Sequence, residues 1–343
     1  MENVITGKYF KQDDFSQREK EVLEQIIKET GFKSEKEIFR GVIYEKDKVG
    51  SLIYKGEYQK KPAVLKLQGL QPEIDETEMV NSFMNQNKSS IVRVPKLYFY
   101  KIWSEDRGYG FQISEYIDAP KIFEVPFATE EQMGEFGKFY QEYRTLALTK
   151  PWLEPTTKDS LELTLKRVEN WQKISEHKGK LKKEDYVPYL EKFYPLAEKH
   201  FPSILLVFCH RHITPNDIYK MSDGSFVLFS NLFWSHCPQW YELAFNIWAC
   251  MQHIRDVNYG FDDLLKYIEK WRQSYHQIPI IQEDKDFDRK LDINLLERTM
   301  GAILVDIGVN DFYDKPENQK YFQHLLKLHQ QFFDYLAEKL KGF

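Results

Sequence analysis

Hydrophobic residues follow a strand-like spacing in the first third of the chain. From Ile38 the pattern becomes strand-like, and in Ala63–Leu67 alternation places Val64 and Lys66 on the same face. A spacing of two is typical of β-strands with one buried face. We therefore expect a three-stranded antiparallel meander and two further strands of the same sheet: Ile38–Tyr44, Ser51–Tyr58, Ala63–Leu67, Val92–Tyr98 and Gly110–Ile117.

Helical spacing precedes the sheet and dominates the chain after it. Ser16–Glu19 has the capping-box pattern that starts a helix, and this helix should stop at Gly31. Thr129–Gln132 repeats the pattern and leads into a stripe of apolar residues at helical spacing. The sequence thus predicts an α+β protein, with further helices over Pro72–Asn85, Tyr186–Phe201, Phe261–Tyr275, Ile293–Gly308 and Gln319–Leu340.

Composition and charge narrow the class of protein. The 343 residues suffice for two lobes, each with its own core. A formal net charge of −5 gives no general attraction to phosphate backbones, so nucleic acid is not an expected partner. No run of about 18 apolar residues occurs and the first residues have no signal-peptide core, so no membrane partner is expected. Three scattered cysteines, Cys209, Cys237 and Cys250, are typical of reduced thiols in the cytoplasm.

Reactive polar residues gather between Phe208 and Ala244. A loop with two histidines follows an apolar run. An Asp-Gly pair then lies between two short strand-like runs, which predicts a tight hairpin because glycine adopts positive φ without steric cost. The hairpin returns the chain toward its start. We therefore expect His212, Asp217 and Ser230 to lie close together.

The order of loop, hairpin, loop and closing segment resembles the aminoglycoside phosphotransferase and choline kinase branch of the protein-kinase-like fold. The pattern of that branch is roughly H-G-D-x-x-P-x-N, a hairpin, an I-D dipeptide and P-x-x-Y-D-L-A. The matching residues are His210, Pro215, Pro238, Tyr241, Leu243 and Ala244, with Glu242 where the family has Asp. The resemblance implies two lobes. Residues 1–117 would form an N-terminal lobe of a leading helix, a five-stranded antiparallel sheet and one helix, and residues 118–343 a helical C-terminal lobe that carries the hairpin 208–244.

Three positions that carry the family's chemistry differ in this chain. His212 stands at the position of the catalytic Asp, Asp217 at that of the metal-binding Asn, and Ser230 at that of the metal-binding Asp. In phosphoryl transfer these groups hold magnesium and orient the attacking hydroxyl. Asp217 can still offer a carboxylate to a metal, and neutral His212 can accept a hydroxyl proton. Ser230 offers at most a neutral hydroxyl and imidazole is a poor magnesium ligand, so we expect ATP with magnesium to bind weakly or not at all. Losing one such preorganised interaction also costs roughly 10²–10³ in rate, so efficient phosphoryl transfer is not expected.

The same resemblance assigns nucleotide-binding residues to the sheet. Lys66 stands like the third-strand lysine that holds the α- and β-phosphates, and its expected helix partner is Glu76, with Glu78 as the alternative. Backbone groups near Glu115 and Ile117 would bond an adenine ring. The turn that would cover the phosphates, residues 45–50, contains no G-x-G-x-x-G motif.

The sequence alone leaves two other kinds of site open, a zinc site and a cysteine–histidine nucleophile pair. The side chains of zinc-ligand type near the loop are Cys209, His210, His212, Asp217, His236 and Cys237, and a zinc site needs three or four of them to converge. Cys209 and His212 are also a candidate nucleophile pair, but Cys209 follows an apolar run typical of an inert core thiol.

Two functions fit the pattern. The first is a phosphotransferase-like pseudoenzyme, which binds a nucleotide, a small molecule or a protein partner without efficient phosphoryl transfer. It depends on the three substituted positions taken together. The alternative is an atypical ATP-dependent small-molecule phosphotransferase, in which Asp217 holds the metal and Lys66 holds the phosphates.

Overall fold

The computed structural model describes residue 15 and residues 18–42, 49–69 and 74–343. The described chain forms an α+β structure with two compact units. We call them the sheet unit and the helical unit. The sheet unit contains the described residues up to 87, residues 93–119 and residues 221–232. The helical unit contains residues 88–92, 120–220 and 233–343.

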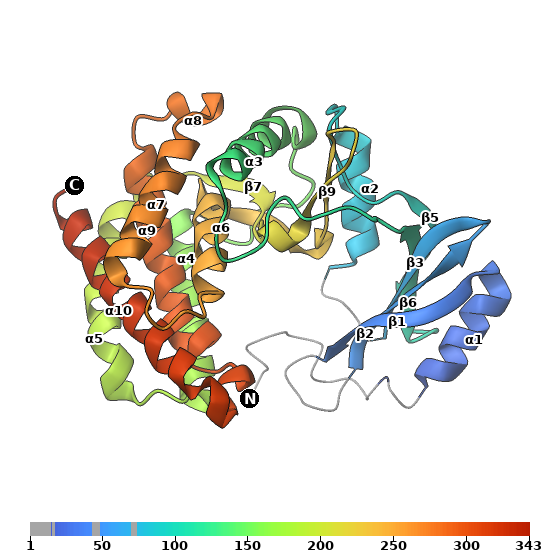
Figure 1. Cartoon of the computed structure of the whole chain (residues 1–343), viewed down its shortest axis with the longest axis horizontal. Coiled ribbons are helices and arrows are strands. Elements are labelled where there is room, and N and C mark those ends of the chain that lie inside the picture. The colour runs from blue at the N-terminus through green and yellow to red at the C-terminus, as the bar shows by residue number, and fades with distance from the viewer. Residues whose placement is uncertain (1–14, 16–17, 43–48, 70–73) are drawn as a thin grey trace. The chain divides into compact units, whose positions relative to one another are not determined.

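The sheet unit is built on five antiparallel strands in the order β1-β2-β3-β6-β5 (Figure 1). Each neighbouring pair is antiparallel, as the alternating pattern predicts. The elements of this unit are α1 (Glu19–Thr30), β1 (Lys33–Val42), β2 (Val49–Tyr58), β3 (Lys61–Gln68), α2 (Glu76–Gln86), β5 (Leu97–Ser104), β6 (Tyr109–Glu115) and β9 (Phe226–Leu228), and the short β4 (Val92–Arg93) lies at its boundary.

Strand β3 shows how the pattern forms the sheet. Ala63, Leu65 and Leu67 are fully buried, whereas Lys66 on the other face is only partly buried. Helix α1 packs its apolar stripe into the same core, and ion pairs join it to β1 (Glu19 with Arg40) and to β5 (Glu29 with Lys101). The predicted stop at Gly31 is confirmed, because Gly31 is the left-handed C-cap of α1 with φ +72°. Ser16 and Gln17 of the predicted capping box lie outside the described residues.

The helical unit packs long helices around one apolar core. Its central helix is α9, which is buried on all sides from Leu291 to Gly301. The capping box predicted at Thr129 is confirmed at the start of α3. The elements of this unit are α3 (Glu130–Glu142), α4 (Ser160–Lys178), α5 (Lys183–His200), β7 (Leu206–His210), β8 (Ile218–Lys220), β10 (Trp234–Pro238), α6 (Tyr241–Gln252), α7 (Phe261–Tyr275), α8 (Pro279–Gln282), α9 (Phe287–Gly301) and α10 (Gln319–Lys341). None of the helices in the described ranges combines the length and apolarity that a membrane crossing needs.

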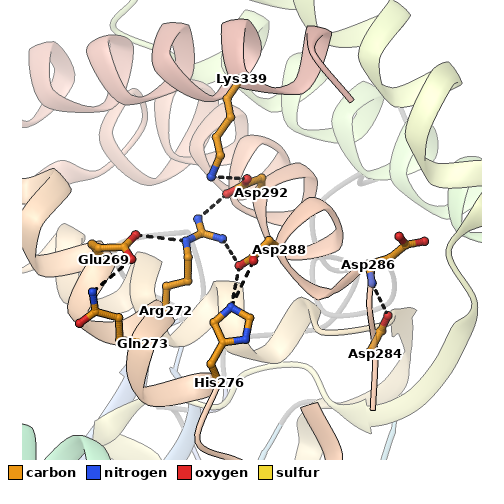
Figure 2. Close-up of polar contacts among 9 residues, drawn as sticks. All are labelled: Glu269, Arg272, Gln273, His276, Asp284, Asp286, Asp288, Asp292 and Lys339. Atoms are coloured by element: carbon orange, nitrogen blue, oxygen red, sulfur yellow. Dashed lines mark hydrogen bonds and ion pairs between the residues drawn. The ribbon is translucent and has the colours of Figure 1, made fainter. Parts of the chain in front are cut away.

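A buried ion network ties three of these helices together (Figure 2). Arg272 of α7 donates to Asp288 (2.7 Å) and Asp292 (2.5 Å) of α9, and Lys339 of α10 pairs with Asp292 (2.8 Å). The Asp292 carboxylate is fully buried and is held by two cations. His276 adds a contact of 3.1 Å to Asp288. Because buried charges need partners, this network fixes the packing of α7, α9 and α10.

Two π-helical turns interrupt the predicted helices. The stripe that begins α3 continues into the turn η3 (Tyr143–Ala147), and the predicted helix Ile293–Gly308 is divided into α9 and the turn η7 (Ala302–Ile307). The spacing of apolar residues cannot reveal such turns. A π-helical turn holds one extra residue but shifts the apolar face of the helix by less than the width of that face. Turns of this kind often lie at functional sites, so η3 and η7 are candidate positions for one.

Candidate functional site

The predicted ion pair between Lys66 and Glu76 is present in the sheet unit. Lys66 extends from β3, and Glu76 is the first residue of α2. The second carboxylate oxygen, Oε1 of Glu76, accepts a 3.0 Å hydrogen bond from the backbone N–H of Asn231. Asn231 is itself 2% exposed and donates from its side chain to the carbonyl of Leu228. Both oxygens of Glu76 are therefore engaged, and the Lys66 amine is held in one place.

Asp75 fixes the start of the helix that presents Glu76. Its carboxylate caps α2 by accepting the N–H of Thr77 (2.8 Å), and it also accepts the N–H of Trp103 in β5 (3.1 Å). Asp75 is not among the site residues predicted from the sequence. An Asp directly before a Glu-rich helix start is an N-cap signal that could have identified it.

The residues proposed to contact an adenine ring lie at the end of β6. The Glu115 carboxylate forms a bidentate pair with Arg93 (2.6 and 3.1 Å), and the backbone N–H of Glu115 donates to the carbonyl of Lys96 (2.9 Å). Its side chain thus stabilises the sheet unit. Ile117 is 9% exposed. Adenine recognition would use backbone groups of Glu115 and Ile117, and it remains a prediction.

In the helical unit, the π-helical turn η3 supports the loop with the two histidines. The N–H of the fully buried His210 donates to the hydroxyl of Tyr143 (2.7 Å). Arg144 donates to the carbonyl of Phe208 (2.9 Å) and lies 3.5 Å from the buried carboxylate of Glu242. Burial raises the pKa of the Tyr143 phenol, so its hydroxyl stays neutral and can accept the His210 N–H. Tyr143 and Arg144 thus hold the backbone at Phe208 and His210, and the supporting role of the His210 side chain stays a prediction.

His212 and Asp217 lie together, as predicted. Nδ1 of His212 is 3.2 Å from Oδ2 of Asp217, which also accepts the hydroxyl hydrogen of Thr214. Asp217 is 5% exposed, whereas the His212 side chain is 36% exposed. The imidazole stacks on Phe233 with ring centroids 4.3 Å apart, and Phe245 packs against it at 4.7 Å. The loop thus presents an oriented imidazole backed by a buried carboxylate.

Ser230 belongs to the sheet unit. It has a positive φ of 57°, which is uncommon for a residue other than glycine, asparagine or aspartate. This conformation directs the chain so that the N–H of the next residue, Asn231, reaches Glu76. The proximity of Ser230 to His212 and Asp217 stays a prediction.

The loop does not fit the two-carboxylate magnesium clamp that the resemblance implies. Asp217 is its one carboxylate, and Oδ2 is already bonded to His212 and Thr214. His212 offers imidazole, which magnesium binds poorly. Among the residues that the structure describes, no three His, Cys, Asp or Glu side chains converge on a common metal position. Asp217 as a metal ligand stays a prediction, and the chemistry that we propose for this loop uses no metal.

Asp306 is a charged residue near the histidine loop that was not predicted from the sequence. It lies in the π-helical turn η7 and pairs with the buried Arg298 (2.8 Å). Burial raises the pKa of Asp306, while the positive charges of Arg298 and His212 act in the opposite direction. No local motif distinguishes Asp306, because one of its charged neighbours, His212, is distant from it in the sequence.

The cysteines near the loop are core residues. Cys209 and Cys237 are 0% and 1% exposed on the paired strands β7 and β10, within one apolar cluster. Burial raises the pKa of the Cys209 thiol, so it is a poor nucleophile, as its apolar surroundings in the sequence predict.

Comparison with known proteins identifies the fold. No protein-family model matches the chain, and no curated protein matches its sequence. Among solved structures, a microcompartment-associated aminopropanol kinase aligns with a TM-score of 0.65 and 12% identity, over 93% of this chain and 98% of that one. A thermostable mutant of aminoglycoside phosphotransferase APH(4)-Ia, solved with ADP and hygromycin B, aligns at 0.59 and 10%, over 92% and 97%. An ethanolamine kinase of Plasmodium vivax aligns at 0.55 and 10%, over 93% and 84%.

The chain has the aminoglycoside phosphotransferase fold. This agrees with the α+β, protein-kinase-like architecture that the sequence predicts, and the five-stranded antiparallel sheet and the many helices match those of the neighbours. At about one residue in ten identical, the similarity extends to the fold and not to the activity.

Proposed function

We propose that the protein is a nucleotide-dependent phosphotransferase that acts on a small hydroxylated molecule. The observation that carries the proposal is the Lys66–Glu76 pair, with Asn231 bonded to its second oxygen. A lysine held by a carboxylate at the start of a helix is the group that contacts nucleotide phosphates in this fold.

The names of the structural neighbours support the donor and the acceptor class. One neighbour was solved with ADP and hygromycin B, and another is named an aminopropanol kinase. A spectinomycin phosphotransferase solved with ADP and spectinomycin covers 94% of this chain at a TM-score of 0.51. By analogy, the nucleotide would bind the sheet unit through Lys66, with backbone groups near Glu115 and Ile117 at the adenine.

The reactive group of the helical unit would be His212. Asp217 and the ring of Phe233 fix its orientation, which lowers the entropic cost of a reaction at the imidazole. Histidine changes protonation near neutral pH and can take part in proton transfer. The protein would therefore perform phosphoryl transfer with an imidazole where its structural neighbours' family has a carboxylate.

A second function, ligand binding without phosphoryl transfer, is favoured by one observation. Oδ2 of Asp217 is already bonded to His212 and Thr214, so the loop offers no free carboxylate pair to magnesium. A pseudoenzyme of this kind would bind nucleotide through Lys66 and release no nucleoside diphosphate.

Nucleotide binding and turnover separate these functions. Binding of ATP, with and without magnesium, is measured by calorimetry for the wild type, for Lys66→Ala and for Lys28→Ala, a matched control at an exposed position of α1. Release of ADP is then measured with a panel of amino alcohols and aminoglycosides. Binding lost only in Lys66→Ala together with acceptor-dependent ADP release supports the phosphotransferase. Binding without release favours the second function, and absence of binding contradicts both.

A further inference from the structure

We propose that His212 is itself the phosphoryl acceptor, so that the protein forms a phosphohistidine at Nε2 of this residue. The proposal rests on the proposed function for the phosphoryl donor, a nucleoside triphosphate. The choice of His212 and of its Nε2 atom as the acceptor rests on the residues that surround the imidazole.

The imidazole of His212 is held from three directions. Phe233 stacks on the ring with an interplanar angle of 19°, Phe245 packs against it, and Asp217 contacts Nδ1. All these groups belong to the helical unit. A ring fixed in this way loses little conformational freedom when it reacts.

The hydrogen bonds of Asp217 determine which nitrogen is nucleophilic. Its Oδ2 accepts the hydroxyl hydrogen of Thr214 and therefore acts as an acceptor toward Nδ1 as well. Nδ1 of a neutral ring must then carry the hydrogen, which leaves the lone pair on Nε2. No group in the described part of the chain is bonded to Nε2. The His212 side chain as a whole is 36% exposed.

The reaction needs the imidazole of His212, the carboxylate of Asp217 and the nucleoside triphosphate. The Nε2 lone pair forms a bond to the terminal phosphorus while the bond between that phosphorus and its bridging oxygen breaks. The oxygen leaves with the nucleoside diphosphate, and the hydrogen on Nδ1 stays in its bond to Asp217. The product ring carries a positive charge that the buried carboxylate of Asp217 opposes. A hydroxyl of the acceptor, or water, then attacks the phosphorus while the bond between phosphorus and Nε2 breaks. The electron pair of that bond returns to Nε2, the attacking hydroxyl gives its proton to solvent, and the neutral imidazole is restored.

The carboxylate that the family has at this position orients a hydroxyl, whereas an imidazole can also carry the phosphoryl group between donor and acceptor. A covalent route divides the transfer into two displacements. It also explains why a buried acidic residue lies behind the histidine, because Asp217 fixes the tautomer that leaves Nε2 free.

The test uses two phosphoryl donors with the full-length chain. γ-³²P-labelled ATP reports the complete reaction. Phosphoramidate, a small donor that phosphorylates nucleophilic histidines directly, reports His212 without any need for nucleotide binding. Phosphohistidine is recognised because it is stable in base and lost in acid, and peptide mass spectrometry locates it. The variants are His212→Gln, Asp217→Asn and the matched control His177→Gln, an exposed histidine at the end of α4.

We expect both donors to label the wild type and His177→Gln at His212, and to leave His212→Gln unlabelled. Asp217→Asn should be labelled roughly 10⁴-fold more slowly, since the tautomer is no longer fixed. Thermal melting of each variant distinguishes loss of labelling from loss of folding. Labelling of His212 by phosphoramidate alone supports the nucleophile and contradicts the proposed nucleotide-dependent function. Acceptor-dependent ADP release with no label at His212 from either donor overturns this inference and leaves the proposed function intact. No label and no ADP release contradict both.

Discussion

The backbone N–H of Asn231 donates a 3.0 Å hydrogen bond to Oε1 of Glu76, across 155 positions of the sequence. Glu76 holds Lys66 with its other oxygen. The bond therefore connects the segment after β9 to the start of α2 and to the centre of the sheet. One amine is positioned by groups from three separate parts of the chain, and this arrangement motivates the first prediction.

Glu76→Gln should weaken ATP binding by roughly tenfold or more, because a hydrogen bond between charged groups contributes about 1.5–3 kcal/mol. The amide keeps the size of the side chain but removes the charge that holds Lys66. Glu78→Gln is the matched control, since Glu78 is exposed on the same turn of α2. Calorimetric titration measures both. Equal losses for the two variants would contradict the assignment of Glu76 as the partner.

Tyr143→Phe should lower the free energy of unfolding by about 1–3 kcal/mol, because it removes the acceptor of the His210 N–H inside the core. The ring itself is kept, so the packing of η3 is preserved. Urea denaturation measures the change, with Tyr335→Phe on exposed α10 surface as control. A change no larger than that of the control would show that this bond does not stabilise the loop.

Arg272→Met should destabilise the helical unit by about 3–5 kcal/mol, because it leaves the buried Asp292 with Lys339 as its one remaining cation in the network. The double variant Arg272→Met with Asp292→Leu should recover most of this loss, because it also removes the buried carboxylate that had lost Arg272 as its partner. Lys270→Met, at an exposed position of the same helix, is the control. If the double variant is less stable than Arg272→Met, the network stabilises by attraction and not merely by satisfying Asp292.

Acid should destabilise the helical unit partly through Asp288. Burial alone would raise the pKa of Asp288, but the hydrogen bond and charge of Arg272 outweigh it and lower the pKa below the ordinary value. A carboxylate whose pKa is lower in the folded state stabilises the fold above its unfolded pKa of about 4, and this contribution is lost as the pH falls through the folded value. The decline in stability below about pH 4 should therefore be shallower in Asp288→Asn. Denaturation midpoints at several pH values, with exposed Asp262→Asn as control, test this. A decline as steep as that of the wild type contradicts it.

Restoring the family's residues should create magnesium-dependent nucleotide binding. The triple variant His212→Asp, Asp217→Asn and Ser230→Asp places carboxylates at the two substituted acidic positions and returns the amide between them. We expect magnesium to increase ATP affinity by roughly tenfold in this variant and by less in the wild type, because hard oxygen ligands bind magnesium and imidazole does not. Calorimetry with and without magnesium measures the difference. A variant that folds and shows no magnesium effect would contradict the comparison with the family's residue pattern.

The sheet and most helices could be predicted from the sequence because their signals are local. Alternation in β3, the glycine that ends α1 and the capping box at Thr129 each depend on a few neighbouring residues. The pairing of Lys66 with Glu76 was predictable because the resemblance supplied the register. The contact between His212 and Asp217 was predictable because it spans five residues within one loop.

The supports of the site could not be predicted, because they join residues far apart in the sequence. Tyr143 contacts a residue 67 positions away, and Asn231 contacts one 155 positions away. Asp306 depends on the winding of η7, which no apolar spacing reveals. The role of Asp217 was also ambiguous, because the sequence does not distinguish an aspartate that binds a metal from one that orients a histidine.

The turn η3 makes the loop sensitive to chain length. A π-helical turn contains one more residue than the α-helical winding that it replaces. Deleting one residue within Tyr143–Ala147, such as the exposed Thr145, would replace the π-helical turn with regular α-helical winding. The tighter winding would shift Tyr143 and Arg144, which now bond the backbone of His210 and Phe208. The loop with the two histidines therefore depends on the number of residues in η3 as well as on the side chains of Tyr143 and Arg144.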